Sequence, residues 1–192
     1  MLLACGGRVE TSVTPAPVCT EQMARRWTIP APGDTRSLRV WIDAASQEFD
    51  GWAPYGWRRL RFAMAAWNAL NLPVRFVEAR SARESDVTVD VIESISGQDG
   101  NGERDQAGVT SLTYDAGSIT RARVLIAISA PYAVRYSVTE QQANLLHELG
   151  HALGLPHAAE RSALMAARRN TSSLTGADIA LARRHYASCA GR

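Results

Sequence analysis

The 192-residue chain contains no lysine, three cysteines and only four histidines. All 21 of its basic residues are arginines, and they are scattered along the chain against 19 acidic residues. The resulting formal net charge of +2 does not suggest a protein that binds nucleic acid or a polybasic protein that binds membranes. No apolar run approaches the roughly 18 residues of a membrane-spanning helix. Three cysteines are too few for a disulfide framework.

The rest of the composition is ordinary for a globular protein, with 46% hydrophobic and 21% charged residues. The length favours a single domain. Residues 1–36 differ from the rest because they hold four of the eight prolines and show no sustained apolar period. We therefore predict an N-terminal tail or linker over residues 1–36 and one folded domain over residues 37–192.

The chain begins with Met-Leu-Leu-Ala-Cys5, which resembles the lipobox of bacterial lipoproteins, where the cysteine carries acyl chains. A signal peptide also has a charged start and an apolar segment of roughly 7–15 residues, and only four residues precede Cys5. Two alternatives stay open. Cys5 is either a lipidation site whose signal begins upstream, or a free cysteine in a floppy terminus.

Hydrophobic periodicity predicts a mixed α/β (α+β) domain in which three helices cover a twisted sheet. The predicted strands are Leu38–Asp43, Val74–Ala79, Asp86–Glu93, Gly108–Tyr114 and Arg123–Ser129. The first helix covers residues 55–70. The second starts at a capping box of Thr139 and Gln142, and the third at one of Thr175 and Asp178. The glycine- and acid-rich segment Gly97–Gly108 is predicted to be a loop.

The string HELGHALGLPH, residues 147–157, has the spacing of a metal site. His147 and His151 are four residues apart, so they project from one helix face and can hold one ion together. Glu148 lies about 100° round the helix, where it can reach a metal-bound water without ligating the metal. Gly154 permits a sharp turn that ends the helix and brings back His157 as a third ligand.

Three neutral imidazoles with an open fourth position describe a catalytic zinc site. Zinc lowers the pKa of its bound water toward ~7, and Glu148 would be the general base that takes the water's proton. The alternative is that three surface histidines happen to surround a helix end. Against it, the extended pattern matches at five fixed positions, and three of the four histidines lie within it.

On these residues the chain resembles the metzincin metalloproteases, and among them the bacterial matrixins, the branch that includes the matrix metalloproteinases. Ser-Ala-Leu-Met165 resembles the methionine turn that metzincins place beneath the zinc. Ordinary core packing is the alternative for Met165 alone. The resemblance extends over roughly residues 36–187 and is carried mainly by the motifs after residue 139.

The resemblance implies an exported, monomeric zinc endopeptidase, secreted or lipid-anchored at the bacterial cell surface or periplasm. The implied fold is a twisted five-stranded mixed sheet with one antiparallel edge strand, for which Gly108–Thr113 is the candidate. An extended peptide or protein substrate would pair with this strand, whose main chain supplies affinity while pockets supply selectivity. The alternative is that Gly108–Thr113 is an ordinary strand within the sheet.

Departures from the matrixin pattern limit what carries over. No histidine precedes His147, so the second, structural zinc site of matrixins is absent as such and one catalytic zinc is expected. The cysteine-switch motif of the prodomain is absent as well. For an exported protein we predict a Cys19–Cys189 disulfide, which would leave Cys5 as the odd cysteine.

Calcium is a further candidate cofactor. Oxygen-bearing side chains recur at every second residue, at Asp99, Asn101, Glu103 and Asp105. This spacing resembles the first part of a calcium loop, although the distal glutamate of an EF-hand is missing. In matrixins the loop of this region binds calcium. A solvated polar loop is the alternative.

Three functions compete at this point. The first is a zinc endopeptidase. The second is a non-catalytic zinc-binding or protein-interaction module of the same fold, whose mark would be a lost base or ligand. The third is a zinc hydrolase of non-peptide amides, which would not need an exposed edge strand.

Overall fold

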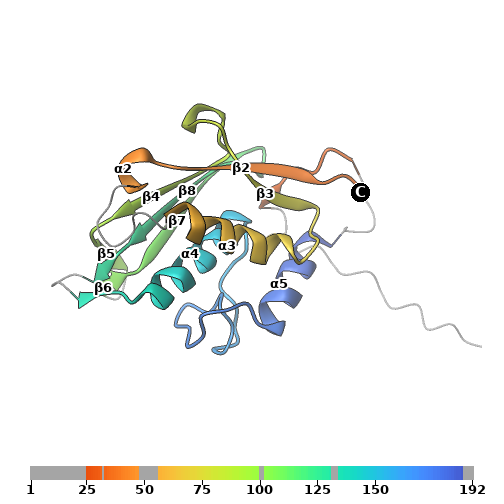
Figure 1. Ribbon diagram of the computed structural model, residues 1–192. Helices are drawn as coiled ribbons and strands as arrows, with labels where there is room; N and C mark the ends of the chain where they lie inside the picture. The colour runs from red at the N-terminus through yellow and green to blue at the C-terminus, as the bar shows by residue number, and fades with distance from the viewer. Residues whose placement is uncertain (1–24, 32, 48–55, 100–101, 131–133, 188–192) are drawn as a thin grey trace, which may run out of the picture.

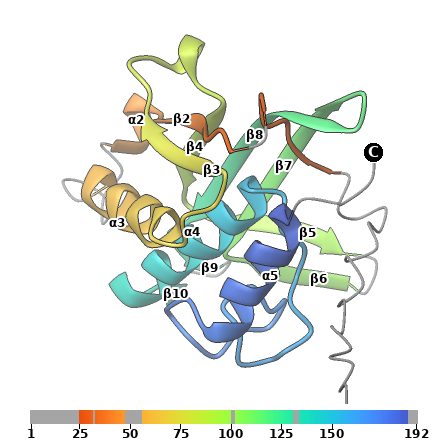
Figure 2. The same cartoon turned by 90° about the vertical axis from the view of Figure 1, so that its right-hand side faces the viewer.

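This computed structural model describes residues 25–31, 33–47, 56–99, 102–130 and 134–187. A twisted sheet forms one layer, and three helices lie together on one side of it (Figure 1). These helices are α3 (Gly56–Asn68), α4 (Val138–Ala152) and α5 (Gly176–Tyr186). Helix α4 packs beside α3 and beneath the sheet, and α5 lies on its other side (Figure 2).

Over the described residues the sheet has six strands, one more than the five that the resemblance implies. They are β1 (Arg26–Trp27), β2 (Arg36–Ile42), β3 (Val74–Glu78), β4 (Val87–Ile92), β7 (Gly108–Asp115) and β8 (Ser118–Ala127). Their order is β1-β8-β4-β2-β3, with β7 paired to the other side of β8. All pairs are parallel except β7 with β8. The predicted mixed sheet is confirmed, and β7 is its antiparallel edge strand.

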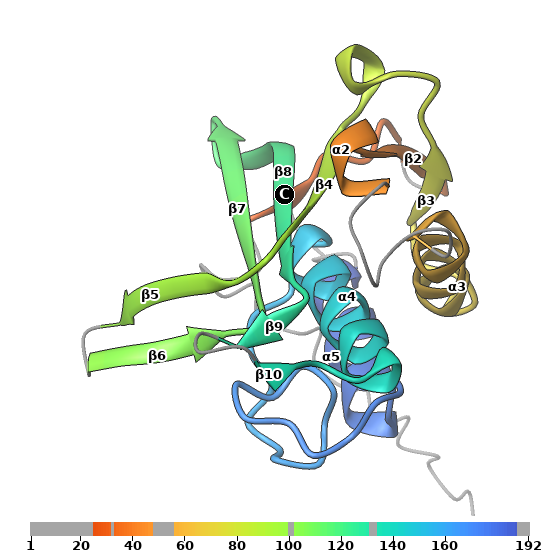
Figure 3. The ribbon, with the colours of Figure 1, turned by 60° about the vertical axis from the view of Figure 1, so that its left-hand side comes forward.

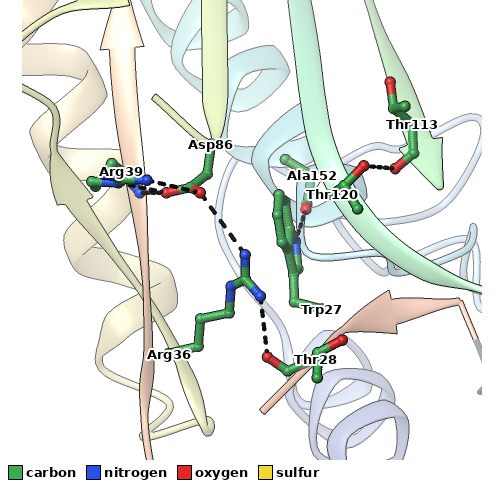
Figure 4. A network of polar contacts seen from close by, with 8 residues as sticks. All are labelled: Trp27, Thr28, Arg36, Arg39, Asp86, Thr113, Thr120 and Ala152. Atoms are coloured by element: carbon green, nitrogen blue, oxygen red, sulfur yellow. Dashed lines mark hydrogen bonds and ion pairs between the residues drawn. The ribbon is translucent and has the colours of Figure 1, made fainter. Parts of the chain in front are cut away.

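Alternation of side chains places the core between the sheet and the helices. Leu38, Val40 and Ile42 of β2 are fully buried, and the residues between them are not. In α3, buried Leu60 and Trp67 share a face with Ala63 and Met64. Directly before β4, the Asp86 carboxylate accepts a hydrogen bond from Arg39 and forms an ion pair with Arg36 (Figure 4).

The folded domain begins earlier than the sequence predicts. Trp27 of β1 has no exposed surface, and β1 pairs with β8 through Trp27 and Ile119. The Trp27 indole N–H donates to the carbonyl of Ala152 at 2.8 Å (Figure 4). The predicted boundary at residue 36 is therefore wrong, because Trp27 belongs to the core. A two-residue strand near prolines gives no periodic signal.

The predicted loop at Gly97–Gly108 is also wrong over most of its length. Strands β5 (Ile95–Asp99) and β6 (Gly102–Gln106) form an antiparallel hairpin that extends away from the sheet (Figure 3). Asn101 and the side chains of Asp99, Glu103 and Asp105 lie outside the described residues, so calcium binding stays a prediction. The short elements are β9 (Ser129–Ala130), β10 (Val134–Arg135), α2 (Ala44–Gln47) and a 3-10 turn η1 (Ala82–Glu84).

The start of α4 differs by two residues from the prediction. Ser137, not Thr139, is the N-cap, and Glu140 takes the place expected for Gln142. The Ser137 hydroxyl accepts from the Glu140 N–H at 3.2 Å, and the Glu140 carboxylate accepts from the Ser137 N–H at 2.7 Å. Both pairs fit the capping-box pattern, and the chain uses the earlier one.

Three predicted residues fall outside the described part of the chain. These are Cys5, Cys19 and Cys189, so lipidation, the disulfide and the export that they imply stay predictions. Among the described residues, no helix is both long enough and apolar enough to cross a membrane.

Candidate metal centre

Helix α4 carries two of the candidate ligands, and a Schellman turn at its end directs the third. Gly154 has a φ of +89°, in the left-handed region that favours glycine. Its N–H donates to His151 O at 2.8 Å, and the Leu155 N–H donates to Gly150 O at 3.2 Å. The chain then reverses and places His157 opposite the helix.

The structure brings His147, His151 and His157 into one cluster. A ring nitrogen from each can be chosen so that all three lie within 4.8 Å of one another. The Nε2 atoms of His147 and His151 are 3.0 Å apart. His147 is buried, His151 is half-buried and His157 is exposed, so the cluster is reached from the side of His157.

Backbone carbonyls orient the two helical rings. His147 Nδ1 lies 2.7 Å from Leu164 O, and His151 Nδ1 lies 2.7 Å from Leu155 O. A carbonyl oxygen only accepts, so each Nδ1 carries the proton and each Nε2 presents a lone pair. The Leu155 carbonyl belongs to the Schellman turn, so the helix end also fixes the His151 ring.

The electrostatics of the cluster suit a cation. Burial lowers the pKa of His147 to about 3 and of His151 to about 4, and it also lowers the pKa of His157. The imidazoles are therefore neutral at pH 7. Two lone-pair nitrogens 3.0 Å apart repel each other unless a cation lies between them. Three neutral imidazole nitrogens are donors that zinc prefers.

A turn at Leu164 and Met165 supports the cluster from below. Met165 has no exposed surface, and its sulfur lies against Gly150 so closely that any β-carbon there would overlap it. The Met165 carbonyl accepts from the Ala158 N–H at 2.8 Å, which ties the segment after His157 to this turn. The methionine thus packs against α4 at Gly150, and its role as the turn beneath a zinc ion stays a prediction.

Asp178 holds this turn in place from α5. Its buried carboxylate accepts the N–H of Leu164 at 2.9 Å and of Met165 at 2.8 Å. It also accepts the N–H and the hydroxyl of Thr175, at 2.8 and 2.7 Å, at the start of α5. The Leu164 carbonyl contacts His147, and the Leu164 N–H is bound by Asp178. Asp178 therefore helps to position the His147 ring through Leu164.

Glu148 lies beside the ligands and faces β7. It is 5% exposed, and Oε2 of its carboxylate accepts from the Thr110 hydroxyl at 2.7 Å. Burial raises the pKa of Glu148 to about 7, although the Thr110 hydrogen bond and the Arg169 charge act in the opposite direction. A group with this pKa can take up and release a proton near neutral pH.

Comparison with known proteins agrees with this geometry. The family model described as Matrixin matches residues 56–187. The chain belongs to the matrixin family. This membership makes it a zinc metalloprotease, and the histidine cluster identifies the residues that suit the zinc.

Comparison with solved structures also gives a match for this matrixin. High choriolytic enzyme 1, a hatching enzyme zinc-protease from Oryzias latipes (Medaka fish), is 14% identical with a TM-score of 0.47. The match covers 90% of this chain and 98% of that chain. The comparison of this chain with curated proteins gives no match.

Spacing within one segment revealed the histidines and Glu148 of this matrixin, but contacts between distant segments did not appear in the sequence. Thr110 is 38 residues from Glu148, and nothing in the strand pattern points to their hydrogen bond. Asp178 was predicted only as a helix cap. Its bonds to Leu164 and Met165 depend on how α5 packs, which no local pattern contains.

Proposed function

We propose that this matrixin is a zinc-dependent endopeptidase that hydrolyses peptide bonds of extended polypeptides, with Glu148 as general base. One observation carries the proposal. A buried, hydrogen-bonded carboxylate on α4 adjoins three neutral imidazoles, two on the same helix and the third after the turn that ends it, and a strand edge flanks the carboxylate.

The candidate residues have separate roles in the reaction. His147, His151 and His157 would hold zinc through one ring nitrogen each. Zinc, when bound, polarises a water molecule and the carbonyl of the scissile bond. Glu148 then accepts a proton from that water and passes it to the leaving nitrogen.

Among the described strands, none pairs with β7 on the side away from β8, and this open edge supports the proposal of an extended substrate. The Ala127 N–H donates to Ala107 O at 3.1 Å, so this opposed pair is hydrogen-bonded. Opposed pairs alternate in an antiparallel ladder. In the regular part of β7, the main-chain groups of Gly108, Thr110 and Leu112 therefore point away from β8. A peptide can add a strand along these groups.

The test compares the zinc-loaded wild type with Glu148→Gln on a library of long peptides, and new ends are identified by mass spectrometry. Glutamine keeps the size and polarity of the side chain but cannot accept the proton. We expect cleavage at internal positions by the wild type, and a loss of about 10²–10⁴-fold in kcat for the variant. Zinc content should stay at one ion per chain in both proteins.

Glu84→Gln is the matched control, because Glu84 is an exposed glutamate of η1, far along the chain from the site. Its kcat should equal that of the wild type. Cleavage by Glu148→Gln at the wild-type rate would contradict the role of the base. A zinc-loaded wild type that cuts no peptide would favour the non-catalytic module or a hydrolase of other amides.

A further inference from the structure

Thr110, near the middle of the edge strand β7, faces the candidate base with its side chain and the free edge with its main chain. Its hydroxyl lies 2.7 Å from Glu148 Oε2 and 3.0 Å from Glu148 O. A hydroxyl has one proton to donate but can also accept. The contact therefore persists whether Glu148 is ionised or has taken up a proton.

Glu148 depends on this contact for its orientation. Among the described residues, Thr110 is the only hydrogen-bond donor to the Glu148 carboxylate. A β-branched side chain such as threonine has a restricted χ1 angle, so the donor itself is held by the strand. Without that bond, no hydrogen bond donated by a described residue would set the direction of the carboxylate of this three-torsion side chain.

Gly108 lets the strand approach Glu148 closely enough for this bond. A β-carbon at Gly108 would lie 2.6 Å from Glu148 Cγ and 2.8 Å from Oε1. Gly108 and Thr110 are two residues apart on the strand, so both face α4. Strand and base are thus packed against each other as one unit.

The main chain of Thr110 faces in a different direction. Its N–H and C=O belong to the set that points away from β8, as the alternation from the Ala107–Ala127 pair requires. A substrate strand paired along β7 would meet these groups directly. One residue thus lies between the substrate main chain and the carboxylate that acts on the water.

We infer that Thr110 is a positioning residue: its hydroxyl fixes the Glu148 carboxylate while its main chain binds the substrate strand. The alignment of the base and the alignment of the scissile bond are then set by the same point on β7. This inference rests on the proposed function and adds a specific residue to it.

Kinetics of Thr110→Val and Thr110→Ser provide the first test. Valine keeps the shape and the main chain but removes the donor. We expect kcat to fall about 10–100-fold, since misplacement of a reacting group by about 1 Å has that effect, with KM within about threefold of wild type. Thr110→Ser restores the hydroxyl, and its kcat should return to within about threefold. Thr28→Val, at an exposed threonine outside the edge strand, is the matched control and should match the wild type.

Thermal unfolding of the zinc-free protein provides a second test that does not need activity. Thr110→Val is measured with Glu148 present and again in the Glu148→Ala background. Because the hydrogen bond is lost only when Glu148 is present, the loss in Tm should be about 2–4 °C larger with Glu148 present. Equal losses in both backgrounds would overturn the contact.

The outcomes separate the two proposals. If the wild type and Thr110→Val cleave with equal kcat, the role of Thr110 is wrong and the endopeptidase proposal stands. If the zinc-loaded wild type cleaves nothing, the proposed function fails, and a role for Thr110 in it fails too. A low kcat with unchanged KM, rescued by serine, supports both.

Discussion

At the scale of single residues, Glu148 is an ionisable side chain in a buried environment that disfavours its charged form. Burial raises its pKa to about 7 from the ordinary value of 4.5. The native protein therefore keeps a proton between pH 4.5 and 7 that the unfolded chain releases. The stabilising contribution of the protonated acid is complete below pH 4.5 and is lost as the pH rises through 7.

This linkage predicts a pH-dependent effect of Glu148→Gln on the stability of the metal-free protein. Glutamine imitates the protonated acid and does not titrate. The variant should be close to the wild type at low pH and more stable at high pH, by on the order of 2 kcal/mol. The check is to compare Tm of both proteins in chelator at pH 5 and pH 8. A difference that is equal at both pH values would show that Glu148 has an ordinary pKa.

Most residue roles beyond the motif were not predictable. The histidines, Glu148, Gly154 and Met165 follow from fixed spacing along one segment. Thr110 and Asp178 owe their roles to partners far along the chain, and threonine on a strand or aspartate at a helix start is common for other reasons. Only packing distinguishes these two from their many equivalents.

At the scale of elements, α4 and its ends determine where the ligands lie. Its N-terminus is fixed by Ser137, and its last carbonyls are bound from two sides. Trp27 donates to Ala152 O and the Tyr186 hydroxyl donates to Leu153 O, at 2.8 and 2.7 Å. The turn at Gly154 is thus enclosed by β1 and α5.

Gly154→Ala should disrupt this end of α4. A side chain would be held at positive φ, which costs about 1–2 kcal/mol, and its β-carbon would lie 2.8 Å from Arg25 O. We expect the free energy of unfolding to fall by about 2 kcal/mol or more, with weaker zinc binding because His157 follows the turn. Denaturant unfolding and zinc titration measure both effects.

Gly176→Ala serves as the control for this experiment. Gly176 begins α5, and a β-carbon there would have no atom within 4 Å. Alanine also has the higher helix propensity, so its stability should be unchanged or slightly higher. If Gly154→Ala is equally well tolerated, the turn does not depend on glycine.

The elements themselves were largely predictable, because most have strong periodicity. Strands β2, β3, β4 and β7 lie within a few residues of the predicted ranges, and so do the three main helices. The β5–β6 hairpin escaped prediction because glycine and acidic residues have low strand propensity. β1 escaped because two residues cannot show a period.

At the scale of the whole molecule, the histidine cluster joins two parts of the chain. Two ligands lie on α4 and the third on the segment that leads through Met165 to α5. A bound ion would therefore cross-link the helix to the C-terminal part of the domain. Metal binding to the native state alone stabilises the fold in proportion to the logarithm of the metal concentration.

Removal of zinc should lower the thermal stability. With free zinc about 1,000-fold above its Kd, the stabilisation is about 4 kcal/mol, or a Tm change on the order of 10 °C. The check is calorimetry with zinc, with chelator, and after zinc is restored. His157→Ala should show a much smaller change under the same conditions. A wild-type Tm that does not change when chelator is added would contradict a zinc site that spans the two segments.

The contact between Asp178 and the turn at Leu164 has a consequence for biosynthesis. The chain emerges from the ribosome in order, at about 5–20 residues per second, so the histidines appear before Asp178 does. Until then nothing from α5 fixes the carbonyl that orients His147. β1 likewise cannot pair until β8, which lies more than 90 residues later in the chain, has been synthesised. The orientation of His147 thus depends on a residue that is synthesised after all three histidines.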